Sequence, residues 1–298
     1  MLSFKNISSK ITFSATTISI NINISDAKQS IKQLLRKIGI PETTIKRITK
    51  SDNQILINGK KASTRYWLKA DDLLEIVLYD CDAEHKFVAI DKKIDIRYED
   101  EQILIVYKPS GLLTTPLAKR TDSLVARVLN YYQINGLPNY KIHIVTRLDE
   151  STSGLVLIAK NGLVHNLLSE QKIIKKYHAL VWGRVFPNQY IINTPIAKME
   201  NHTIKRTICI SGKPAHTEII NSKYFEKQQQ SLLDIQLHTG RTHQIRVHLA
   251  SINAPIVYDN LYGYDNEVGE MALQCYYLEL INPFTKIKII INDDLIMV

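Results

Sequence analysis

Apolar residues recur every three or four positions through residues 26–50, the spacing that places them on one face of a helix. In the segment DAKQSIKQLLRKIGI these positions are Ile31, Leu34, Leu35 and Ile38. The segment therefore predicts a helix, which Asp26 can cap and which Gly39 ends. Pro41 suits the first turn of a helix, so PETTIKRITK predicts a second, short helix.

An alternation of apolar and polar residues follows these helices. QILINGKKA, residues 54–62, predicts a strand that turns at Asn58-Gly59, the dipeptide preferred by a type I′ hairpin. LLEIVL, residues 73–78, predicts another strand. Residues 79–93 are polar and irregular, which is typical of a linker between two domains.

From about Ile94 onward, runs rich in Ile, Val, Tyr and Thr dominate the chain and predict strands. They lie at 102–107, 141–146, 154–160, 177–183, 191–196, 206–211, 216–225, 232–239 and 287–292. Runs with helical spacing lie at 123–133, 161–172 and 242–251. Many strands with few helices between them indicate an α+β protein, so we expect a large, mixed, mostly antiparallel sheet.

Composition and charge restrict the class of protein. The chain has 298 residues, 45% of them apolar and 22% charged, as in an ordinary folded protein. A net charge of +9 favours polyanionic partners such as nucleic acid or an acidic lipid surface. The three cysteines show no CxxC spacing, and no apolar run has the roughly 20 residues of a membrane span. We therefore expect a cytoplasmic protein that is not bound to a membrane.

The positive charge is concentrated near the N-terminus. Residues 26–78 hold eleven Lys and Arg against six Asp and Glu. A stripe on the two predicted helices could neutralise phosphates; its members are Lys32, Arg36, Lys37, Lys46, Arg47 and Lys50. On charge alone, an ordinary solvated helix face is an equally good interpretation.

Three segments place charged and aromatic side chains at strand ends, where a rigid scaffold can position them. In VTRLDESTSGLVLIAKN a strand leads Arg147 and Asp149 into a polar loop. Asp149 could form a turn there, or its carboxylate could point into a cleft. In KKYHALVWG the ring of Tyr177 follows two lysines, the second of which is Lys176, although a tyrosine in a sheet usually packs in the core.

The third segment, LHTGRTHQIRVHLAS, ends a strand and begins a helix that carries Arg241 and Arg246. A buried arginine needs a carboxylate partner, so we expect an inward-facing arginine of this helix to pair with Asp149 and to keep it ionised. His238, His243 and His248 recur every five residues, which spreads them around a helix and argues against a zinc site. The chain contains no GxSxG, GxxxxGK[ST] or strand-linked GxGxxG motif, so esterase, nucleotide-hydrolase and dinucleotide-binding functions lack support.

RLDESTSG, KKYHALVWG and GRTHQIRVHL, in this order and separation, resemble the RluA-type family of RNA pseudouridine synthases. The resemblance covers about residues 95–298 and includes YEDEQILIVYKPSGLLTTP. Residues 26–78 resemble the alpha-L RNA-binding motif that commonly precedes this catalytic domain. The implied organisation is an RNA-binding domain at 18–78 with two helices and a hairpin, a linker at 79–93 and a catalytic domain of the pseudouridine synthase fold at 94–298.

The resemblance implies that uridine within RNA is isomerised without a cofactor or metal. By matching position, Asp149 is the catalytic aspartate, Tyr177 stacks on the target base, Arg246 is the partner of the aspartate, and Arg147 helps to displace the base. The remaining residues expected to contact the substrate are Arg241, Lys176, Lys32, Arg36, Arg47 and Lys50. Large-subunit ribosomal RNA is the first expected partner and transfer RNA the second, and no obligate protein partner is implied.

An ionised carboxylate beside the anomeric carbon fits this chemistry, because breaking a glycosidic bond builds positive charge on the sugar. Thr146 stands where the family often has His, and Tyr107 where Asn is frequent. Ala70-Asp71-Asp72 replaces the usual Gly-Asp of the N-terminal motif. Two alternatives remain: an RNA chaperone or assembly factor that kept the fold and lost the chemistry, and a nucleosidase that uses Asp149 to hydrolyse the bond.

Overall fold

The structure is a computed structural model, and it describes most of the chain. The described ranges are 8–14, 16–50, 54–78, 87–137, 141–186, 190–200, 202, 204–264 and 268–293. The side chains of Phe13, Arg47 and Lys50 lie outside the described part. Residues 79–86 of the predicted linker also lie outside it. Residues 87–93, the rest of that linker, contain no helix or strand.

A small unit near the N-terminus combines two helices with a five-stranded sheet. Its elements are β1 (Lys10–Phe13), β2 (Thr17–Asn21), α1 (Ile31–Lys37), α2 (Glu42–Lys50), β3 (Gln54–Ile57), β4 (Lys60–Lys61) and β5 (Leu73–Val77), with the strand order β1-β2-β5-β3-β4. The two predicted helices, the hairpin and β5 are confirmed. Asn58 and Gly59 have φ angles of 51° and 76°, as a type I′ turn requires. β1 and β2 were not predicted from the sequence.

The rest of the described chain is built around a ten-stranded sheet. Its strands are β6 (Asp95–Glu99), β7 (Ile103–Lys108), β8 (His143–Ile144), β9 (Ser153–Ala159), β10 (Ile174–Trp182), β11 (Tyr190–Ile192), β14 (Thr217–Phe225), β15 (Gln230–Leu237), β16 (Leu273–Ile281) and β17 (Lys288–Asn292). The order is β11-β14-β15-β10-β16-β9-β7-β6, with β17 beside β16 and β8 beside β9. A separate hairpin joins β12 (Ile196–Lys198) to β13 (Arg206–Ile208), and three helices are α3 (Leu124–Ile134), α4 (Gly162–Ser169) and α5 (Gln244–Ser251).

The fold class is the predicted one. Within the described residues, the only parallel pairing of the large sheet joins β9 to β16, and every other pairing is antiparallel. All three predicted helices of this part are present. β6 and β16 were not predicted from the sequence, although β16 lies at the centre of the sheet, where it connects the half that contains β10 to the half that contains β9.

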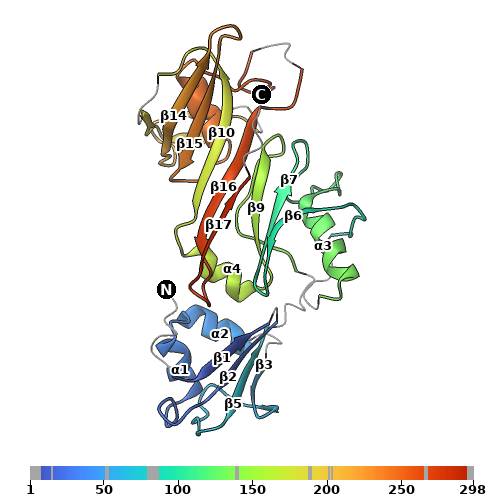
Figure 1. The fold of residues 1–298 in the computed structure, drawn as a ribbon, viewed down its shortest axis with the longest axis vertical. Helices are drawn as coiled ribbons and strands as arrows, with labels where there is room; N and C mark the ends of the chain where they lie inside the picture. Colours follow the sequence, from blue (N-terminus) through green and yellow to red (C-terminus); the bar gives the residue numbers. More distant parts are fainter. Residues whose placement is uncertain are drawn as a thin grey trace.

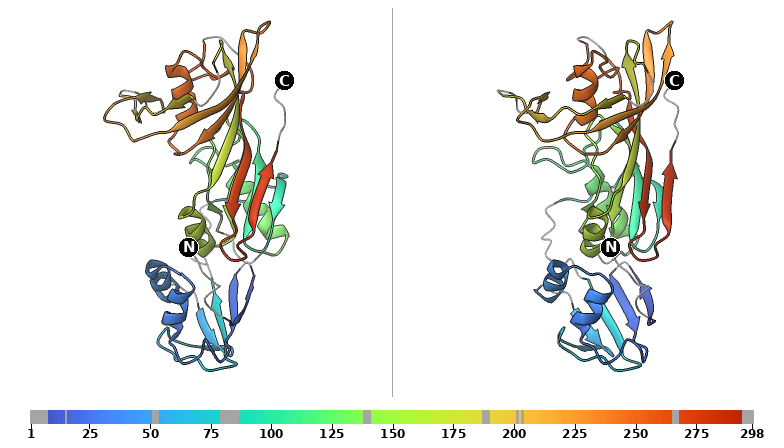
Figure 2. Two further views of the ribbon diagram at one scale, coloured as in Figure 1. Left: turned by 60° about the vertical axis from the view of Figure 1, so that its left-hand side comes forward. Right: turned by 90° about the vertical axis from the view of Figure 1, so that its left-hand side faces the viewer.

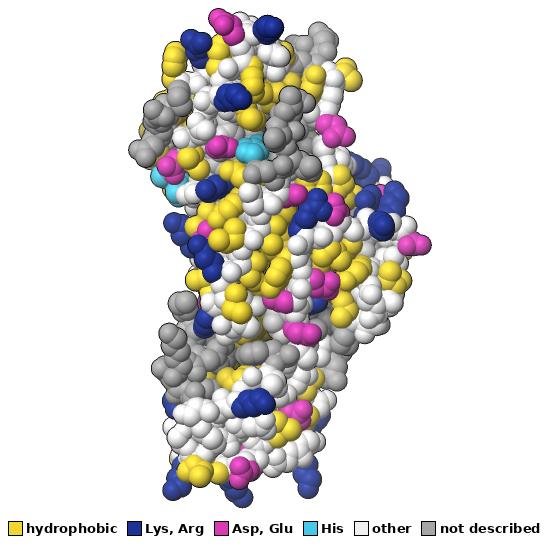
Figure 3. Space-filling model, in the orientation of Figure 1, with side chains coloured by type: hydrophobic (Ala, Val, Ile, Leu, Met, Phe, Trp, Pro, Cys, Tyr) yellow, Lys and Arg dark blue, Asp and Glu magenta, His cyan; other side chains and the backbone are white. Residues whose placement is uncertain are grey.

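The small unit lies at one end of the long sheet, next to α4, while α5 lies near the other end (Figures 1 and 2). A side-chain amide connects the two sheets: Gln102 Nε2 donates to the carbonyl of Ser14 at 2.7 Å. On the face drawn in Figure 3, Lys and Arg side chains lie at the free end of the small unit and along the edges of the larger part, and apolar side chains cover the middle of the large sheet. Among the described residues, no helix combines the length and the apolar character needed to cross a membrane.

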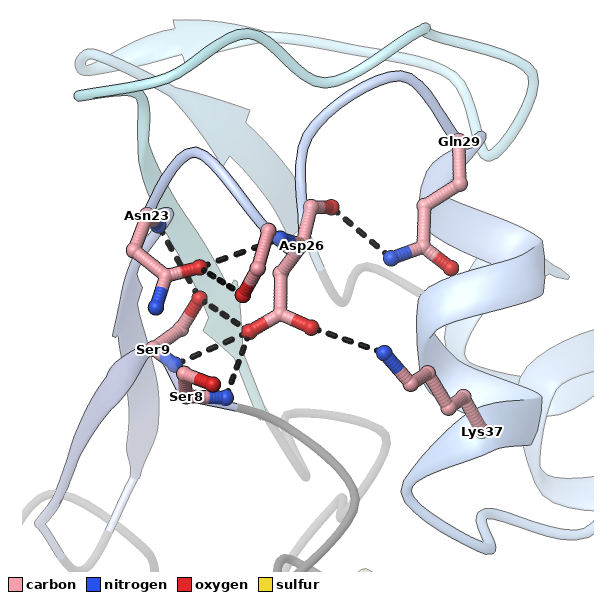
Figure 4. Close-up of polar contacts among 7 residues, drawn as sticks. Ser8, Ser9, Asn23, Asp26, Gln29 and Lys37 are labelled. Carbon is pink, nitrogen blue, oxygen red and sulfur yellow. Dashed lines mark hydrogen bonds and ion pairs between the residues drawn. The ribbon is translucent and has the colours of Figure 1, made fainter.

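Asp26 does not cap α1, contrary to the sequence prediction. The N-cap is Ser30, whose hydroxyl accepts from Gln33 N while the Gln33 side chain accepts from Ser30 N, a capping box. Asp26 is buried instead, and its carboxylate accepts from Ser8 N at 2.8 Å, Ser9 N at 2.9 Å and Lys37 Nζ at 2.8 Å (Figure 4). The carboxylate therefore fastens the segment before β1 to the last turn of α1.

Candidate active site

One cavity of about 520 Å³ collects the three motifs that the sequence analysis singled out. Asp149 comes from the loop between β8 and β9, Tyr177 from β10, and Arg246 from α5. All three side chains line the cavity, together with Leu113, Thr114, Thr115 and Leu117 of the loop that follows β7. The structure therefore brings together the three residues expected to be catalytic, although they are far apart in the chain.

The loop that carries Asp149 is held by hydrogen bonds from the segment after β7. The Thr114 hydroxyl donates to Leu148 O at 2.7 Å, on one side of Asp149. On the other side, Gly111 N donates to Glu150 O at 2.9 Å, and the Ser110 hydroxyl donates to Ser151 O at 2.9 Å. Fixing the backbone on both sides of a side chain limits where that side chain can point, as a catalytic group requires.

Lys108 adds a buried cation to this support. Its side chain is fully buried, and Nζ donates to the carbonyls of Pro109, Leu112 and Glu150 at 2.9, 2.7 and 3.0 Å. Burial lowers the pKa of Lys108 to about 8, although the negative charges of Asp149 and Glu150 oppose that change. No role for Lys108 was predicted from the sequence. A lysine that ends an apolar strand was the available signal, because a lysine there must find acceptors if it is buried.

Thr146, which replaces the family's usual His, also has a structural role. The side chain is buried and lines the cavity, and its hydroxyl accepts from Leu157 N on β9 at 2.9 Å. Thr146 N donates in turn to Leu157 O at 3.2 Å. The position therefore keeps a polar contact between the Asp149 loop and the sheet despite the change of residue.

Tyr177 occupies the middle of the large sheet, between β15 and β16. It pairs with Ile235 on one side and with Cys275 on the other, next to an irregularity in the register. Burial raises the pKa of its phenol well above the usual value, and the neighbouring Cys275, to which the phenol is hydrogen-bonded, and Asp149 act in the same direction. The hydroxyl therefore stays protonated, and the ring presents a rigid aromatic wall to the cavity.

Arg246 does not form the predicted ion pair with Asp149. Among the described residues its partner is Asp259: Nε donates to Oδ2 at 2.7 Å and Nη2 to Oδ1 at 2.6 Å, and both side chains are buried. Burial alone would lower the pKa of Arg246, but Asp259, with a smaller effect from Asp149, raises it. Asp149 therefore experiences the positive field of Arg246 without a direct hydrogen bond from it.

Asp259 is a site residue that the sequence analysis missed. Its Oδ1 also accepts from Leu261 N at 2.9 Å and Tyr262 N at 3.1 Å, the pattern of an aspartate that shapes a turn. Burial opposes ionisation, but the bonds from Arg246 and from these amides keep its pKa below the usual value. No sequence signal distinguishes Asp259, which pairs with a buried arginine, from an aspartate that only shapes a turn.

His243 is buried at the cavity wall, and its backbone conformation is strained. Its φ of 57° is in the left-handed region, which is uncommon for a residue with a side chain and is often found at functional sites. His243 lines the cavity and contacts the Tyr262 hydroxyl at 3.0 Å through Nδ1. Burial lowers the pKa of the imidazole, which favours its neutral form, while Asp149 opposes this change.

Comparisons with known proteins agree with this geometry. The family model of RNA pseudouridylate synthase matches residues 102–251, which include all three motifs. A protein of Bacillus subtilis (strain 168) named uncharacterized RNA pseudouridine synthase YjbO is 30% identical over 263 residues, covering 86% of this chain and 92% of the relative. The chain belongs to the RNA pseudouridylate synthase family. The protein is thus an RNA pseudouridine synthase, which confirms the resemblance found in its motifs.

Two further proteins place the synthase among its relatives. Ribosomal large subunit pseudouridine synthase D of Yersinia pestis is 32% identical over 259 residues, covering 83% of this chain and 76% of that protein. The solved structure of Human RNA Pseudouridylate Synthase Domain Containing 1 matches with a TM-score of 0.55 at 22% identity, covering 67% of this chain and 82% of that chain. At this identity the likeness to the human protein concerns the fold.

Of the other residues expected to contact the substrate near the catalytic aspartate, Arg147 and Arg241 line the cavity and Lys176 does not. Arg147 is exposed at the cavity, and Arg241 is exposed at its rim, with Nε donating to Pro214 O at 2.9 Å. Lys176 does not line the cavity: its Nζ lies 4.9 Å from the centre of the Tyr277 ring. Lys175 lines the cavity instead, as expected for a strand in which residues two apart share a face.

The basic stripe of the small unit is partly neutralised. Glu42 accepts from Lys32 Nζ at 2.7 Å and from Arg36 Nη2 at 2.7 Å, and these two cations lower its pKa. Lys37 is paired with Asp26. The Arg47 and Lys50 side chains lie outside the described residues. RNA binding by this stripe stays a prediction.

Proposed function

We propose that this synthase converts uridine to pseudouridine in large-subunit ribosomal RNA, with Asp149 as its single catalytic carboxylate. The observation that carries the proposal is that Asp149, Tyr177 and Arg246 line one cavity, with the Asp149 loop held on both sides by hydrogen bonds. The relative from Yersinia pestis, whose name states that substrate, supports the choice of RNA. The same proposal places the enzyme in the cytoplasm, where that RNA is made and folded in bacteria.

The reaction rearranges bonds within one nucleotide. The bond between N1 of uracil and C1′ of ribose breaks, the uracil turns, and C5 forms a new bond to C1′. The proton on C5 is lost and N1 ends protonated, so the composition does not change and the chemistry requires no metal or cofactor. Two roles are open to Asp149, attack on C1′ or assistance in removing a ribose proton, and both require an ionised carboxylate beside the sugar.

The surrounding residues have complementary roles in this proposal. The Tyr177 ring stacks on the uracil, and Arg147 fills the place that the base leaves in the RNA; together they offset the few kcal/mol needed to extrude a base. Arg246, held by Asp259, supplies a fixed positive field at Asp149. Residues 18–78 form a second contact with the RNA, through Lys32 and Arg36 among the described side chains and through Arg47 and Lys50.

Replacing Asp149 by Asn tests the proposal. Ribosomal RNA from a strain that lacks the gene is incubated with each purified variant, and pseudouridine is then mapped. Asp149→Asn should form none and still bind the RNA, because only the reacting carboxylate is lost. Glu226→Gln is the matched control: it removes one negative charge from an exposed turn and should keep full activity. Pseudouridine formation by Asp149→Asn at the parental rate would contradict the assigned mechanism.

Two outcomes would favour the alternatives. An assembly phenotype of the deletion strain that Asp149→Asn fully rescues, with no uridine modified by the parental enzyme, would identify an RNA-binding assembly factor. Release of free uracil from the RNA would identify a nucleosidase. Neither is expected, because the proposed site retains the detached base between Tyr177 and the cavity wall.

A further inference from the structure

A second cavity, of about 470 Å³, lies beside the first and is lined by basic side chains. Its charged lining residues are Lys198, Arg206, Lys213 and Arg241. Neither Asp nor Glu contributes to the described lining, and no carboxylate of the described residues forms an ion pair with any of the four. A concave site with cations only is suited to an anion.

The hairpin that builds this cavity places like charges opposite each other. Lys198 on β12 is the direct cross-strand partner of Arg206 on β13. Lys213 approaches from the other side, because its backbone pairs with Ile196 at 3.0 and 2.8 Å. Like charges directly opposite on two strands destabilise a sheet, so this arrangement costs stability unless an anion is bound between them.

The backbone around the cavity is shaped for this approach. At Gly212 an added Cβ would lie 2.5 Å from the backbone of Ile196, so only glycine lets this turn close onto β12 and carry Lys213 beside it. The Arg206 guanidinium is placed by the carbonyls of Ile204 and Lys205, at 3.2 and 3.3 Å from Nη1. Arg241 is placed through Nε by Pro214 O, and its two terminal nitrogens have no partner among the described residues.

The second cavity is adjacent to the active site. Gly240, Arg241 and Thr242 line both cavities, so one short segment forms the wall between them. A ligand that reaches from one cavity to the other must have a reacting base at one end and negative charge at the other. An RNA strand with one extruded nucleotide has that form, since phosphates flank each nucleoside.

We propose that the cavity between the β12–β13 hairpin and the Gly240–Thr242 segment binds a backbone phosphate of the RNA next to the extruded uridine. The proposal rests on the proposed function. Lys198, Arg206, Lys213 and Arg241 hold this phosphate and thereby fix the distance from the RNA backbone to Asp149. The contact carries no sequence information and positions the strand.

Replacing two of the cations tests the site. In Lys198→Gln combined with Lys213→Gln, the slope of log binding constant against log salt for ribosomal RNA from the deletion strain should become shallower by up to about 0.7, since the four cations share one phosphate and each phosphate contact to a single strand contributes roughly 0.7. KM should rise while kcat at saturating RNA holds. The melting temperature should not fall, because the opposed charges are removed. Lys172→Gln combined with Lys227→Gln removes the same charge from exposed positions and should change neither slope nor KM.

Neutral phosphates locate the contact. A synthetic RNA that spans the mapped uridine carries one methylphosphonate linkage at a time. The parental enzyme should lose affinity at a linkage next to that uridine, and the Lys198, Lys213 variant should be insensitive there. Equal losses in both enzymes would overturn the proposal. The proposal would also be overturned if no methylphosphonate linkage changed the affinity while inorganic phosphate competed with RNA more strongly than another salt of the same ionic strength. That result would indicate a site for the free anion.

The failure of this proposal is separable from failure of the proposed function. If the parental enzyme forms no pseudouridine at all, the function is wrong. If it does, and the variant keeps the parental salt slope and KM, the function stands and the phosphate site is wrong.

Discussion

Arg246 holds Asp259 with two hydrogen bonds, of 2.7 and 2.6 Å, while Asp149 stands in the same cavity without a direct bond to it. The guanidinium is therefore positioned by a residue that does not line the cavity. This arrangement leaves the Asp149 carboxylate free to meet the sugar. A bidentate bond from Arg246 to Asp149 would engage both carboxylate oxygens of Asp149 and leave neither free for the sugar in the proposed mechanism.

Asp259→Asn should damage both stability and activity. It leaves the buried Arg246 charge without its partner, a loss that typically costs about 3–5 kcal/mol. The free guanidinium is then expected to turn toward Asp149 and lower kcat more than it changes KM. Chemical unfolding and steady-state kinetics measure the two effects. Glu279→Gln breaks the ion pair of a half-buried carboxylate with the exposed Lys288, near the surface, and should cost less than about 1 kcal/mol. A variant Asp259→Asn as stable and active as the parent would show that the pair is dispensable.

Lys108→Met should loosen the loop that carries Asp149. It removes the donor of three buried or partly buried hydrogen bonds, to the carbonyls of Pro109, Leu112 and Glu150. We expect a lower melting temperature and a lower kcat, with RNA binding through the remaining surface retained. Faster hydrogen exchange of Gly111 N, which donates to Glu150 O, would show the loosening directly.

Lys108 also predicts the sign of a pH effect. Its pKa is about 8 in the fold and 10.5 in the unfolded chain. Between these values the unfolded chain binds more protons, so this lysine makes the free energy of unfolding rise with pH, and the buried cation costs stability below the window. Denaturation across that window should show a steeper rise for the parental protein than for Lys108→Met. The same slope in both proteins would exclude the buried lysine as its source.

Local patterns predicted most of the helices and strands, whereas the partners of residues far apart in the chain were not predicted. The hairpin at Asn58-Gly59 and the helices at 31–37 and 42–50 are determined by residues close together in the chain, so they can be predicted from the sequence. The partner of Arg246 is Asp259, and tertiary packing decides where the turn that carries Asp259 lies. From the sequence alone, several carboxylates are equally good candidates for this partner. Asp26 was assigned to the wrong role for the same reason, because a nearby Ser30 competes for the cap and Lys37 attracts the carboxylate.

Asp26→Asn should destabilise the small unit. The carboxylate is buried, and although burial raises its pKa, the hydrogen bonds from Lys37, Ser9 and Ser8 together lower it below 3.8 (Figure 4). The stabilisation is therefore complete above the unfolded pKa and is lost as the pH falls through the folded one. Unfolding followed at falling pH should show an acid-sensitive step in the parent that is absent from Asp26→Asn, which starts from lower stability at neutral pH. Equal acid sensitivity in both would assign the step to other carboxylates.

The basic stripe of the small unit should contribute to RNA binding through counterion release. Replacing Lys32, Arg36, Arg47 and Lys50 by Gln should weaken binding of ribosomal RNA and flatten its salt dependence by up to about 3 in slope, at roughly 0.7 for each phosphate contact with a single strand. Catalysis at saturating RNA should be preserved, because every residue that lines the active-site cavity lies between Leu113 and Leu273 in the chain and none belongs to the small unit. An unchanged slope would assign the four side chains to an ordinary solvated face.

Glu42→Gln distinguishes an RNA-binding stripe from an ordinary solvated face, because only an RNA-binding stripe should gain affinity for RNA from this change. Glu42 now holds Lys32 and Arg36 through exposed ion pairs, which contribute little to stability, and a phosphate must compete with it for both cations. Without the carboxylate, RNA should bind more tightly at low salt and with a steeper salt dependence. The helix loses one favourable acid from its first turn, a cost of about 0.3–1 kcal/mol that circular dichroism can follow. If the stripe is only a solvated face, Glu42→Gln will lower stability slightly and leave RNA affinity at the parental value.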